Sequence, residues 1–288
     1  MSIRLEDVSY TYLPNSPYEC NALQNIDIQI EEGEFIGIIG HTGSGKSTLI
    51  QHFNGLLKPT TGRVTVDDID LGSKSADLRA IRQRVGMVFQ YPEHQLFEET
   101  VFEDIAYGPK NMGLSTEKIS SMVQKAMSTV NLDFEKYRYM SPFTLSGGEK
   151  RRVAIAGVLA MEPKYLILDE PTAGLDPKGR NEILVNIEQL HKKEKMAVVF
   201  VTHSMDDIAR LADRLIVINS GRIIFSDTPR KVFKEYEVLQ KTGLDIPTVG
   251  RLMLELQKKG WNVRNDLLTI EEAKNEIMKH AREVGRNA

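Results

Sequence analysis

A glycine-rich segment, Gly40-His41-Thr42-Gly43-Ser44-Gly45-Lys46-Ser47, contains the residue types that bind phosphate. It follows a buried-strand pattern at residues 35–39 and precedes a helical pattern at residues 48–53. Glycines let backbone N–H groups wrap around phosphate oxygens, and the helix N-terminus adds a favourable dipole. The Lys46 ammonium is expected to reach the β- and γ-phosphates, and the Ser47 hydroxyl to bind Mg²⁺. A chance glycine-rich turn would not explain the strand, the helix and the Lys-Ser ending together. We expect nucleotide contacts from Gly40, His41, Thr42, Gly43, Ser44, Gly45, Lys46, Ser47 and Thr48.

Two carboxylates, Asp169 and Glu170, end a second buried-strand pattern that begins at Tyr165. Ligands of an α/β sheet bind beyond the carboxyl ends of its strands. Asp169 is expected to hold Mg²⁺ through water, and Glu170 to polarise an attacking water as general base. The structural alternative is an acidic N-cap for a helix after Pro171. The phosphate loop argues against this alternative, because it supplies the substrate on which a base would act.

The strands that position these groups are predicted by short apolar runs. The runs are continuous rather than alternating, which is typical of strands buried on both faces of a largely parallel sheet. They lie at residues 35–39, 85–89, 165–168, 197–201 and 215–218. Residues 1–34 and 60–71 contain alternating stretches instead, which predict a small antiparallel sheet beside the core. A hairpin strand is expected at residues 221–225.

Two regions of the sequence read as helical. Residues of about 94–162 lack a strong buried-strand run and predict a helical insertion, with one helix at residues 120–130. Residues 229–288 predict a charged C-terminal helical extension, in which apolar residues from Val249 to Leu256 line one helical face. Thr269 and Glu272 have the spacing of a capping box. We therefore divide the chain into a nucleotide-binding domain at residues 1–228 and an extension at residues 229–288.

Composition limits the classes of function. The chain of 288 residues has 41% hydrophobic and 27% charged residues and a formal net charge of −3. This charge does not favour nucleic-acid binding. The single cysteine, Cys20, excludes an internal disulfide and fits a reducing compartment. No stretch approaches the roughly 18 apolar residues of a membrane-spanning helix. We therefore expect a cytoplasmic protein; if it works at a membrane, a partner must hold it there.

A second motif, Leu145-Ser146-Gly147-Gly148-Glu149, decides which phosphate-loop proteins the chain is similar to. With it, residues 1–225 resemble the ATP-binding cassette (ABC) ATPases, although Glu149 stands where many members have glutamine. The resemblance implies an α/β phosphate-loop NTPase core with a mostly parallel sheet, an antiparallel β subdomain and a helical insertion. It implies ATP and Mg²⁺ as ligands. Residues 1–228 would form the ABC ATPase domain.

The resemblance also implies roles for residues outside the phosphate loop. Ser146, Gly147 and Gly148 would face the γ-phosphate held by an opposing subunit. Gln90 would sense Mg²⁺, water or γ-phosphate. His203 would contact the γ-phosphate, Tyr12 would stack on adenine, and Asp176 would end a loop at the dimer interface. Taken singly, His203 reads as a surface histidine, Gln90 as a solvated turn residue, and Tyr12 as a packing aromatic.

The segment after Gln90, Tyr91-Pro92-Glu93-His94-Gln95-Leu96-Phe97, resembles the ATPase subunits of energy-coupling factor transporters. It is most similar to the second of their two paired ATPases. This implies a heterodimer with a non-identical ATPase, a transmembrane scaffold subunit docking near residues 90–105, and indirect contact with a substrate-binding membrane protein. Leu96, Phe97, Val101, Phe102 and Ile105 are candidates for the docking surface, or else core of the insertion. The transported solute, a vitamin or a transition-metal ion, is not identified.

Two alternatives remain open at this point. One is the ATPase subunit of a conventional ABC solute or metal importer, working as a homodimer with the same chemistry. The other is a soluble ABC ATPase of DNA repair or translation, which the single cassette, the absence of a long coiled-coil insertion and the charge of −3 disfavour. A passive nucleotide-binding protein is disfavoured because Glu170 is present.

Overall fold

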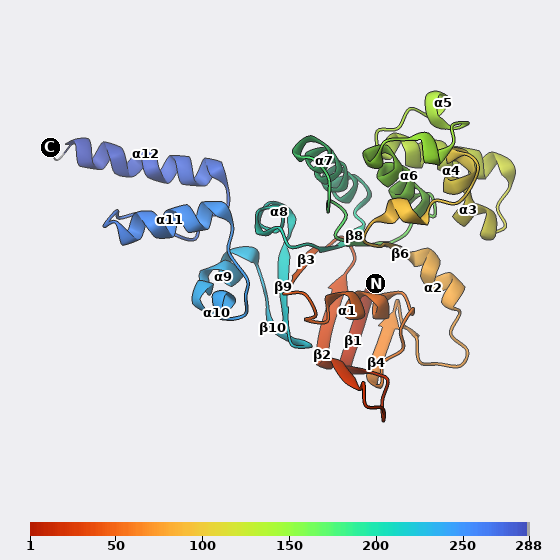
Figure 1. Ribbon diagram of the computed structural model, residues 1–288, viewed down its shortest axis with the longest axis horizontal. Coiled ribbons are helices and arrows are strands. Elements are labelled where there is room, and N and C mark those ends of the chain that lie inside the picture. Colours follow the sequence, from red (N-terminus) through yellow and green to blue (C-terminus); the bar gives the residue numbers. More distant parts are fainter. Residues whose placement is uncertain (287–288) are drawn as a thin grey trace.

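Six strands form the larger sheet of the computed structural model, which describes residues 1–286 (Figure 1). Their order is β10-β9-β3-β8-β7-β6, and β10 runs antiparallel to β9 while the other neighbours are parallel. The strands are β3 (Phe35–Ile39), β6 (Val85–Val88), β7 (Tyr165–Asp169), β8 (Ala197–Val201), β9 (Arg214–Asn219) and β10 (Arg222–Asp227). All residues of β3, β6, β7 and β8 are buried, which explains why their sequences are continuously apolar. The predicted strands are confirmed.

A smaller antiparallel sheet, in the order β2-β1-β4-β5, covers one face of the large sheet. Its strands are β1 (Ser2–Tyr12), β2 (Cys20–Glu31), β4 (Thr61–Val66) and β5 (Ile69–Asp70). Helix α1 (Lys46–Phe53) packs in the same core as both sheets, since Leu49 and Phe53 share a hydrophobic cluster with Ile28 of β2 and Ile36 of β3. The predicted antiparallel subdomain is confirmed.

Helices cover the other face of the large sheet and one end of it (Figure 1). Between β6 and β7 the regular elements are helical, so the predicted insertion is confirmed. The insertion consists of η1 (Pro92–Gln95), α3 (Val101–Asn111), α4 (Thr116–Thr129), α5 (Phe134–Tyr137), η2 (Pro142–Thr144) and α6 (Gly147–Leu159). Helix α2 (Leu78–Arg84) precedes β6, and α7 (Pro177–Glu194) and α8 (Met205–Leu211) follow β7 and β8. None of the helices within residues 1–286 is both long and apolar enough to cross a bilayer.

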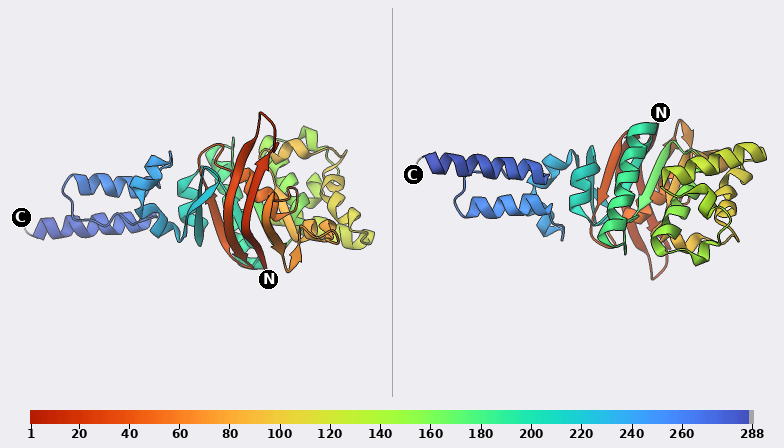
Figure 2. Two further views of the ribbon diagram at one scale, coloured as in Figure 1. Left: turned by 90° about the horizontal axis from the view of Figure 1, so that it is seen from below. Right: turned by 90° about the horizontal axis from the view of Figure 1, so that it is seen from above.

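The C-terminal extension has two parts that differ in where they pack. Helices α9 (Pro229–Lys234) and α10 (Tyr236–Lys241) contribute Phe233 and Leu239 to the main core, beside Ile208 of α8. Helices α11 (Thr248–Lys258) and α12 (Ile270–Arg286) lie side by side and project from the body (Figure 2). They have a small core of their own around Met253, Val263, Leu267 and Ala273.

The predicted capping box at the start of α12 is confirmed. The backbone N–H of Glu272 donates to Oγ1 of Thr269 at 3.2 Å, and the N–H of Thr269 donates to Oε2 of Glu272 at 3.2 Å. The last two residues of the predicted extension, Asn287 and Ala288, lie outside the described part of the chain.

The order of the parallel strands brings the predicted chemical groups to one edge. Strand β8 lies between β3 and β7. The phosphate loop follows β3, Asp169 and Glu170 lie at the end of β7, and His203 comes shortly after β8. Because the carboxyl ends of parallel strands lie at the same edge of a sheet, three segments distant in sequence converge there.

Candidate active site

The phosphate loop connects the end of β3 to α1, and the protein holds it from two sides. Gly45 has a φ of +107°, and a Cβ at this position would lie 2.5 Å from the carbonyl oxygen of Ala22 in β2. Only glycine therefore fits between the loop and the small sheet. On the other side, the N–H of Gly221, in the turn between β9 and β10, donates to the carbonyl of Ser44 at 2.9 Å. His41 Nε2 lies 3.1 Å from Oδ1 of Asn219, at the end of β9.

Lys46, the first residue of α1, points its ammonium group back into the loop. Its Nζ donates to the carbonyl oxygens of Gly40 at 2.7 Å and His41 at 3.0 Å. Burial lowers the pKa of Lys46, whereas the charges of Glu170 and Asp169 act to raise it. A buried cation thus lies beside backbone N–H groups at a helix N-terminus, which is the arrangement that binds phosphate.

The next residue, Ser47, reaches the acidic strand end. Its hydroxyl donates to Oδ2 of Asp169 at 3.3 Å. Burial raises the pKa of Asp169, while the Ser47 hydrogen bond and the charge of Lys46 lower it. Two hard oxygen ligands of the kind that Mg²⁺ prefers are therefore adjacent, although 122 residues separate them in the sequence.

Glu170 occupies a strained and mostly buried position. Its φ is +50°, in the left-handed region, and its N–H donates to the carbonyl of Val201 in β8 at 3.0 Å. Burial first, and then the neighbouring charge of Asp169, raise the pKa of Glu170 to about 7. A carboxyl group with such a pKa can accept a proton from water near neutral pH.

His203 faces this carboxylate from the loop after β8. Its Nε2 lies 3.2 Å from Oε1 of Glu170, but Oε1 is buried and has no hydrogen bond in acceptable geometry. Burial and the charge of Lys46 lower the pKa of His203, so its neutral form predominates at neutral pH. The pair leaves one carboxylate oxygen available for a further donor, such as a water molecule.

Tyr12 stands at the other end of the phosphate loop. Its hydroxyl lies 3.2 Å from Oγ1 of Thr48 in α1. Beside it is a hollow of about 420 Å³. The hollow is lined by Tyr12, Cys20, Asn21, Ala22, Gln24, Gly43, Gly45, Lys46, Ser47, Thr48, Ser220 and Gly221. It therefore runs from an aromatic ring to the phosphate loop, as a nucleotide requires.

Several residues that line this hollow were not predicted from the sequence. They are Cys20, Asn21, Ala22, Gln24, Ser220 and Gly221. Cys20 and Tyr12 are register partners in the β1–β2 hairpin, so the expected antiparallel pairing was the signal that would have located Cys20. Ser220 and Gly221 gave no such signal, because only the fold brings the β9–β10 turn to the loop.

Ser146, Gly147 and Gly148 are not part of this cluster. Ser146 is the N-cap of α6, and its hydroxyl and N–H donate to Oε2 of Glu149 at 2.7 and 2.9 Å. These hydrogen bonds lower the pKa of Glu149 to about 2. A Cβ on Gly147 or Gly148 would meet no atom within 4 Å, so packing among residues 1–286 gives no reason for either glycine. The helix N-terminus faces outward, with room for a group from outside the chain.

Gln90 and Asp176 are also placed away from the phosphate loop's hydrogen-bond network. Gln90 follows β6, is exposed, and its side chain forms no hydrogen bond within the described chain. Asp176 is the N-cap of α7 and accepts from the N–H of Gly179 at 3.1 Å. The structure thus gathers Tyr12, Lys46–Thr48, Asp169, Glu170 and His203, and leaves Gln90, Asp176 and Ser146–Gly148 at separate positions.

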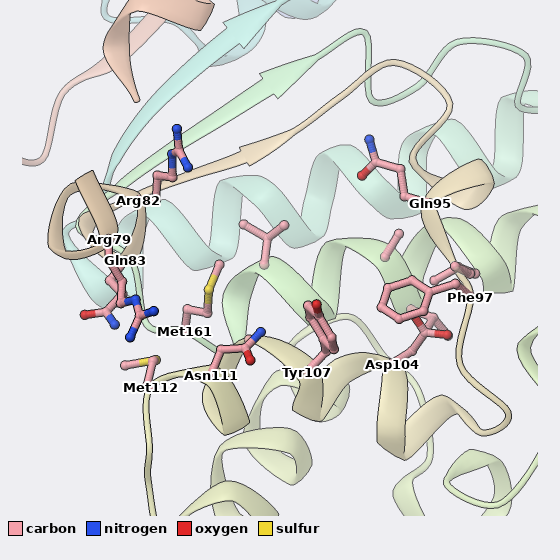
Figure 3. A pocket seen from close by; sticks show the side chains of 16 residues that line it. Arg79, Arg82, Gln83, Gln95, Phe97, Asp104, Tyr107, Asn111, Met112 and Met161 are labelled. Atoms are coloured by element: carbon pink, nitrogen blue, oxygen red, sulfur yellow. The ribbon is translucent and has the colours of Figure 1, made fainter. Parts of the chain in front are cut away.

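A groove of about 470 Å³ lies near the segment that follows Gln90 (Figure 3). Gln95, Phe97 and Asp104 line one part of it, Tyr107 and Asn111 of α3 continue the wall, and Arg79, Arg82 and Gln83 of α2 line another part. Leu96, Gly108, Met112, several residues of α6 and Met161 complete the lining.

Of the five apolar residues expected as a docking surface, only Leu96 and Phe97 line the groove. Phe97 is 58% exposed, but Val101 and Ile105 are fully buried, and Phe102 packs against the same core. For these three residues the core interpretation is correct, because α3 turns them toward α4 and α6.

A glycine-rich loop with a buried lysine, an acidic strand end with a buried carboxyl group and a facing histidine, and an exposed Ser-Gly-Gly helix N-terminus together define an ABC ATPase. Comparison with known proteins agrees with this class. Residues 23–173 match the family model of the ABC transporter. The chain is 56% identical to the energy-coupling factor transporter ATP-binding protein EcfA2 of Clostridium perfringens over 278 residues, which covers 96% of this chain and 98% of that protein. It is 49% identical to the protein of the same name from Enterococcus faecalis, over 99% of both chains.

Solved structures give the same result. The structure of cbiO1 from Clostridium perfringens, part of the ABC transporter complex cbiONQ, matches with a TM-score of 0.73 and 40% identity, over 87% of this chain and 98% of that one. The ATP-binding cassette MJ0796, a dimer in a post-hydrolysis state bound to ADP and phosphate, matches with a TM-score of 0.70 and 31% identity, over 79% and 98%. The chain belongs to the ABC transporter family and, within it, to the ATP-binding proteins of energy-coupling factor transporters. It is an ATP-binding ATPase, and the predicted fold and the resemblance to the second ATPase type are confirmed.

Proposed function

We propose that this chain is the ATP-hydrolysing subunit of an energy-coupling factor import complex for a vitamin or a transition-metal ion. One observation supports the proposal most directly. The phosphate loop and Glu170 lie together, whereas the Ser146–Gly148 helix start points its N–H groups outward with open space before both glycines. Each chain therefore offers two halves of different ATP sites, and ATP would join two ATPase subunits.

In this proposal the nucleotide lies along the hollow between Tyr12 and the phosphate loop. Tyr12 stacks on the adenine, as aromatic side chains do with bases. The loop from Gly40 to Thr48 surrounds the phosphates, and Lys46 exchanges its two carbonyl partners for phosphate oxygens. The orphaned, buried Oγ of Ser44 is one further group that a phosphate oxygen would satisfy.

The donor set also suits Mg²⁺. The oxygens of Ser47 and Asp169 would hold it, directly or through water, and Gln90 would be the third group that senses it. Bound there, the metal ion would neutralise charge on the β- and γ-phosphates. Glu170 is the proposed general base, which takes a proton from the attacking water through its free Oε1. His203, whose Nε2 lies 3.2 Å from Oε1 of Glu170, would donate to the γ-phosphate.

The partner that completes each ATP site is a second ABC ATPase. We propose a non-identical one, giving a heterodimer, because the relatives carry the name of one numbered subunit type; a homodimer is the alternative. Ser146, Gly147 and Gly148 would bind the γ-phosphate held by that partner, and Asp176 would lie at the interface. The end-on N–H groups of α6 have the polarity that an anion requires.

A transmembrane scaffold subunit is the proposed occupant of the groove at Leu96, Phe97 and Tyr107. The groove suits an amphipathic helix from a membrane subunit. Its lining residues Gln95 and Leu96 follow Gln90 closely in the sequence, so a helix bound there would lie next to the Gln90 segment. The chain would then be a peripheral protein at the cytoplasmic face of the cell membrane. A substrate-binding membrane protein would contact it only through the scaffold, and nucleic acid has no part in this function.

We propose a separate role for each part of the chain. Residues 1–228 would act as the ABC ATPase domain, with the helical subdomain at about 94–162 for coupling, and residues 229–288 as the extension. We propose that the apolar hollow of α11 and α12, lined by Val249, Leu252, Ile277 and Met278, binds the corresponding extension of the second ATPase. This contact would keep the dimer together between cycles of ATP hydrolysis.

Purification of the native complex tests the proposal. The chain is isolated from its own membranes in mild detergent, and every co-purifying protein is identified by mass spectrometry. A second related ATPase, a scaffold and small substrate-binding membrane proteins would support the energy-coupling factor assignment. Recovery of this ATPase as a homodimer with a large conventional permease would instead support the conventional importer.

A further inference from the structure

Arg151 is a buried arginine that the nucleotide site described above does not use. It lies in α6, five residues after Ser146, and its side chain is 2% exposed. Its Nε and Nη2 donate to the two carboxylate oxygens of Glu93 at 3.0 and 2.7 Å. Its Nη1 donates to the carbonyl oxygens of Pro171 at 3.2 Å and Ala173 at 2.6 Å. One guanidinium group therefore joins three separate segments of the chain.

Each of the three segments leads to a different functional element. Glu93 lies in η1, three residues after Gln90 and two before Gln95 of the groove. Pro171 and Ala173 lie between Glu170 and Asp176. Helix α6 begins at the Ser146 cap, and further along it Val153, Ala154, Gly157 and Val158 line the groove. The Arg151 contacts thus form one continuous covalent and hydrogen-bonded connection between the groove, the Glu170 loop and the helix start.

The ion pair between Arg151 and Glu93 can transmit a movement of η1 to the segments that Arg151 contacts. A buried charge is costly unless it is paired, so Arg151 and Glu93 stay together when either segment moves. The paired, parallel hydrogen bonds of an arginine fork fix direction as well as distance. Burial acts to raise the pKa of Glu93, but the hydrogen bond and charge of Arg151 bring it below its ordinary value, so Glu93 remains ionised near neutral pH.

We infer that Arg151 is a positioning residue, which through Glu93 and the carbonyls of Pro171 and Ala173 sets the Gln90 segment, the loop after Glu170 and the signature helix relative to one another. Movement of η1 by a group in the groove moves the guanidinium, and the guanidinium moves the loop that follows the base. The inference rests on the proposed function, because it assumes that a partner in the groove drives ATP hydrolysis.

Two conservative substitutions test this role. Glu93→Gln keeps the shape of the side chain and removes its charge, while Arg151→Lys keeps the charge and removes the fork. Each variant is purified as the native complex, and kcat and KM for ATP hydrolysis are measured with ATP binding and thermal stability. We expect kcat to fall on the order of 10- to 100-fold, as for a small misplacement of reacting groups. KM and ATP affinity should be unchanged, because neither residue contacts the phosphate loop.

The double variant and a matched control make the result specific. Glu93→Gln with Arg151→Lys should lose no more activity than the worse single variant, since the two residues form one unit. The control is Glu162→Gln, which removes a carboxylate from an exposed ion pair with Lys125 in the same helical region, 2.9 Å apart, and should leave kcat unchanged. Should Arg151→Lys not fold, Glu93→Gln decides alone, because it leaves the contacts of Arg151 with the two carbonyls intact.

Unchanged kcat in Glu93→Gln would overturn the inference. A fall in kcat accompanied by a comparable change in KM or in ATP affinity would also overturn it, since that pattern indicates a general distortion of the nucleotide site; lower thermal stability alone is expected from the unpaired buried guanidinium. Failure of the proposed function has a different signature: the unsubstituted complex would then lack a scaffold partner, or would hydrolyse ATP at the same rate with and without it.

Discussion

The hydroxyl of Ser47 donates to Oδ2 of Asp169 at 3.3 Å, which joins the phosphate loop to the end of β7. This contact lies beside Lys46, whose ammonium group is close enough to shift the pKa values of Asp169 and Glu170. A hydroxyl, an ammonium and two carboxylates are therefore concentrated at the edge where β3 and β7 end. Such a concentration of partly buried charge is stable only where a ligand or a proton balances it.

The raised pKa of Glu170 predicts a pH-dependent rate. Because Glu170 must be ionised to accept a proton from water, kcat/KM should rise as the pH increases through about 7 and then reach a plateau. The measurement is kcat/KM for ATP hydrolysis over roughly two pH units on each side of the expected midpoint of about 7. A rate that does not change across neutral pH would exclude Glu170 as a base with this pKa.

Glu170→Gln should bind ATP, stop hydrolysis and trap the closed dimer. Amide and carboxyl groups have nearly the same shape, but the amide does not accept the proton of water. The trapped dimer is measured by gel filtration with ATP, and turnover by phosphate release. Near-normal turnover would show that another residue is the base.

The same substitution predicts a change in stability with a defined sign. The folded-state pKa of Glu170, about 7, lies above its ordinary value of 4.5, so the folded state binds the proton more tightly than the unfolded state does. The free energy of unfolding should therefore fall as pH rises from about 4.5 to about 7. Glu170→Gln removes this titration and should be more stable than the native chain at pH 8, by about 1–3 kcal/mol. Equal denaturation midpoints for the two proteins at pH 8 would contradict the raised pKa.

Lys46→Ala should weaken ATP binding and abolish hydrolysis. The substitution removes a cation whose charge-assisted hydrogen bonds to phosphate are worth about 1.5–3 kcal/mol, or a loss of affinity of about 10- to 100-fold. Isothermal titration with ATP gives the affinity, and phosphate release gives the rate. Persistent turnover would mean that the phosphate loop is misplaced. The control is Lys58→Ala, because Lys58 is an exposed lysine outside the site.

The sequence was sufficient for the groups that a strand or helix end positions directly. The phosphate loop, Asp169 and Glu170 lie at the ends of continuous apolar runs, which predict buried parallel strands. The carboxyl ends of such strands lie at one edge of the sheet, so the sequence alone places these groups together. The choice of His203 as a site residue required the family resemblance, because His203 alone reads as a surface residue, and its place opposite Glu170 was not predicted. The side chain of His203 is indeed 54% exposed, and only the order β3-β8-β7 brings it to the base.

Other features were not accessible from the sequence, for physical reasons. Arg151 looks like one more basic residue in the Lys150-Arg151-Arg152 cluster, and nothing local indicates that it alone is buried against Glu93. The same limit applies to Val101 and Ile105. An amphipathic helix shows an apolar face in its sequence, but not whether that face meets the protein's own core or a partner.

Adenine beside Tyr12 would protect Cys20 from alkylation. Cys20 is exposed, lines the same hollow and is the only cysteine of the chain, so a maleimide reports on this one position. ATP should slow the labelling of Cys20, while inorganic triphosphate, which has no base, should slow it much less. Equal protection by both would place the adenine elsewhere.

Tyr12→Ala should reduce ATP affinity through the loss of base stacking, which is worth about 1–3 kcal/mol per base. Tyr18→Ala is the matched control, since Tyr18 lies between the same two strands, is 80% exposed and does not line the hollow. The ratio of the two affinities is measured by titration with ATP. If both variants bind ATP as the native chain does, Tyr12 is a packing residue.

The apolar hollow of α11 and α12 predicts a contact that does not depend on ATP. Leu252 and Met278 are each 48% exposed on facing helices, and burying the remaining surface of each contributes about 1 kcal/mol. A charge placed at either position should therefore weaken association with the second ATPase when nucleotide is absent. Leu252→Glu and Met278→Glu are compared by analytical ultracentrifugation of the purified ATPase pair, without nucleotide and with ATP.

Asn275→Glu provides the control for this comparison, because it adds the same charge to an exposed position of α12 outside the hollow. We expect Asn275→Glu to leave the dimer intact, and the two hollow variants to dissociate without nucleotide but to associate again with ATP, because the proposed ATP contact at Ser146–Gly148 is separate from the hollow. Equal association of all three variants without nucleotide would show that the extension does not hold the dimer. Dissociation that ATP does not reverse would show instead that the extension contributes to the closed state itself, because ATP binding alone would then be too weak to bring the two ATPase subunits together.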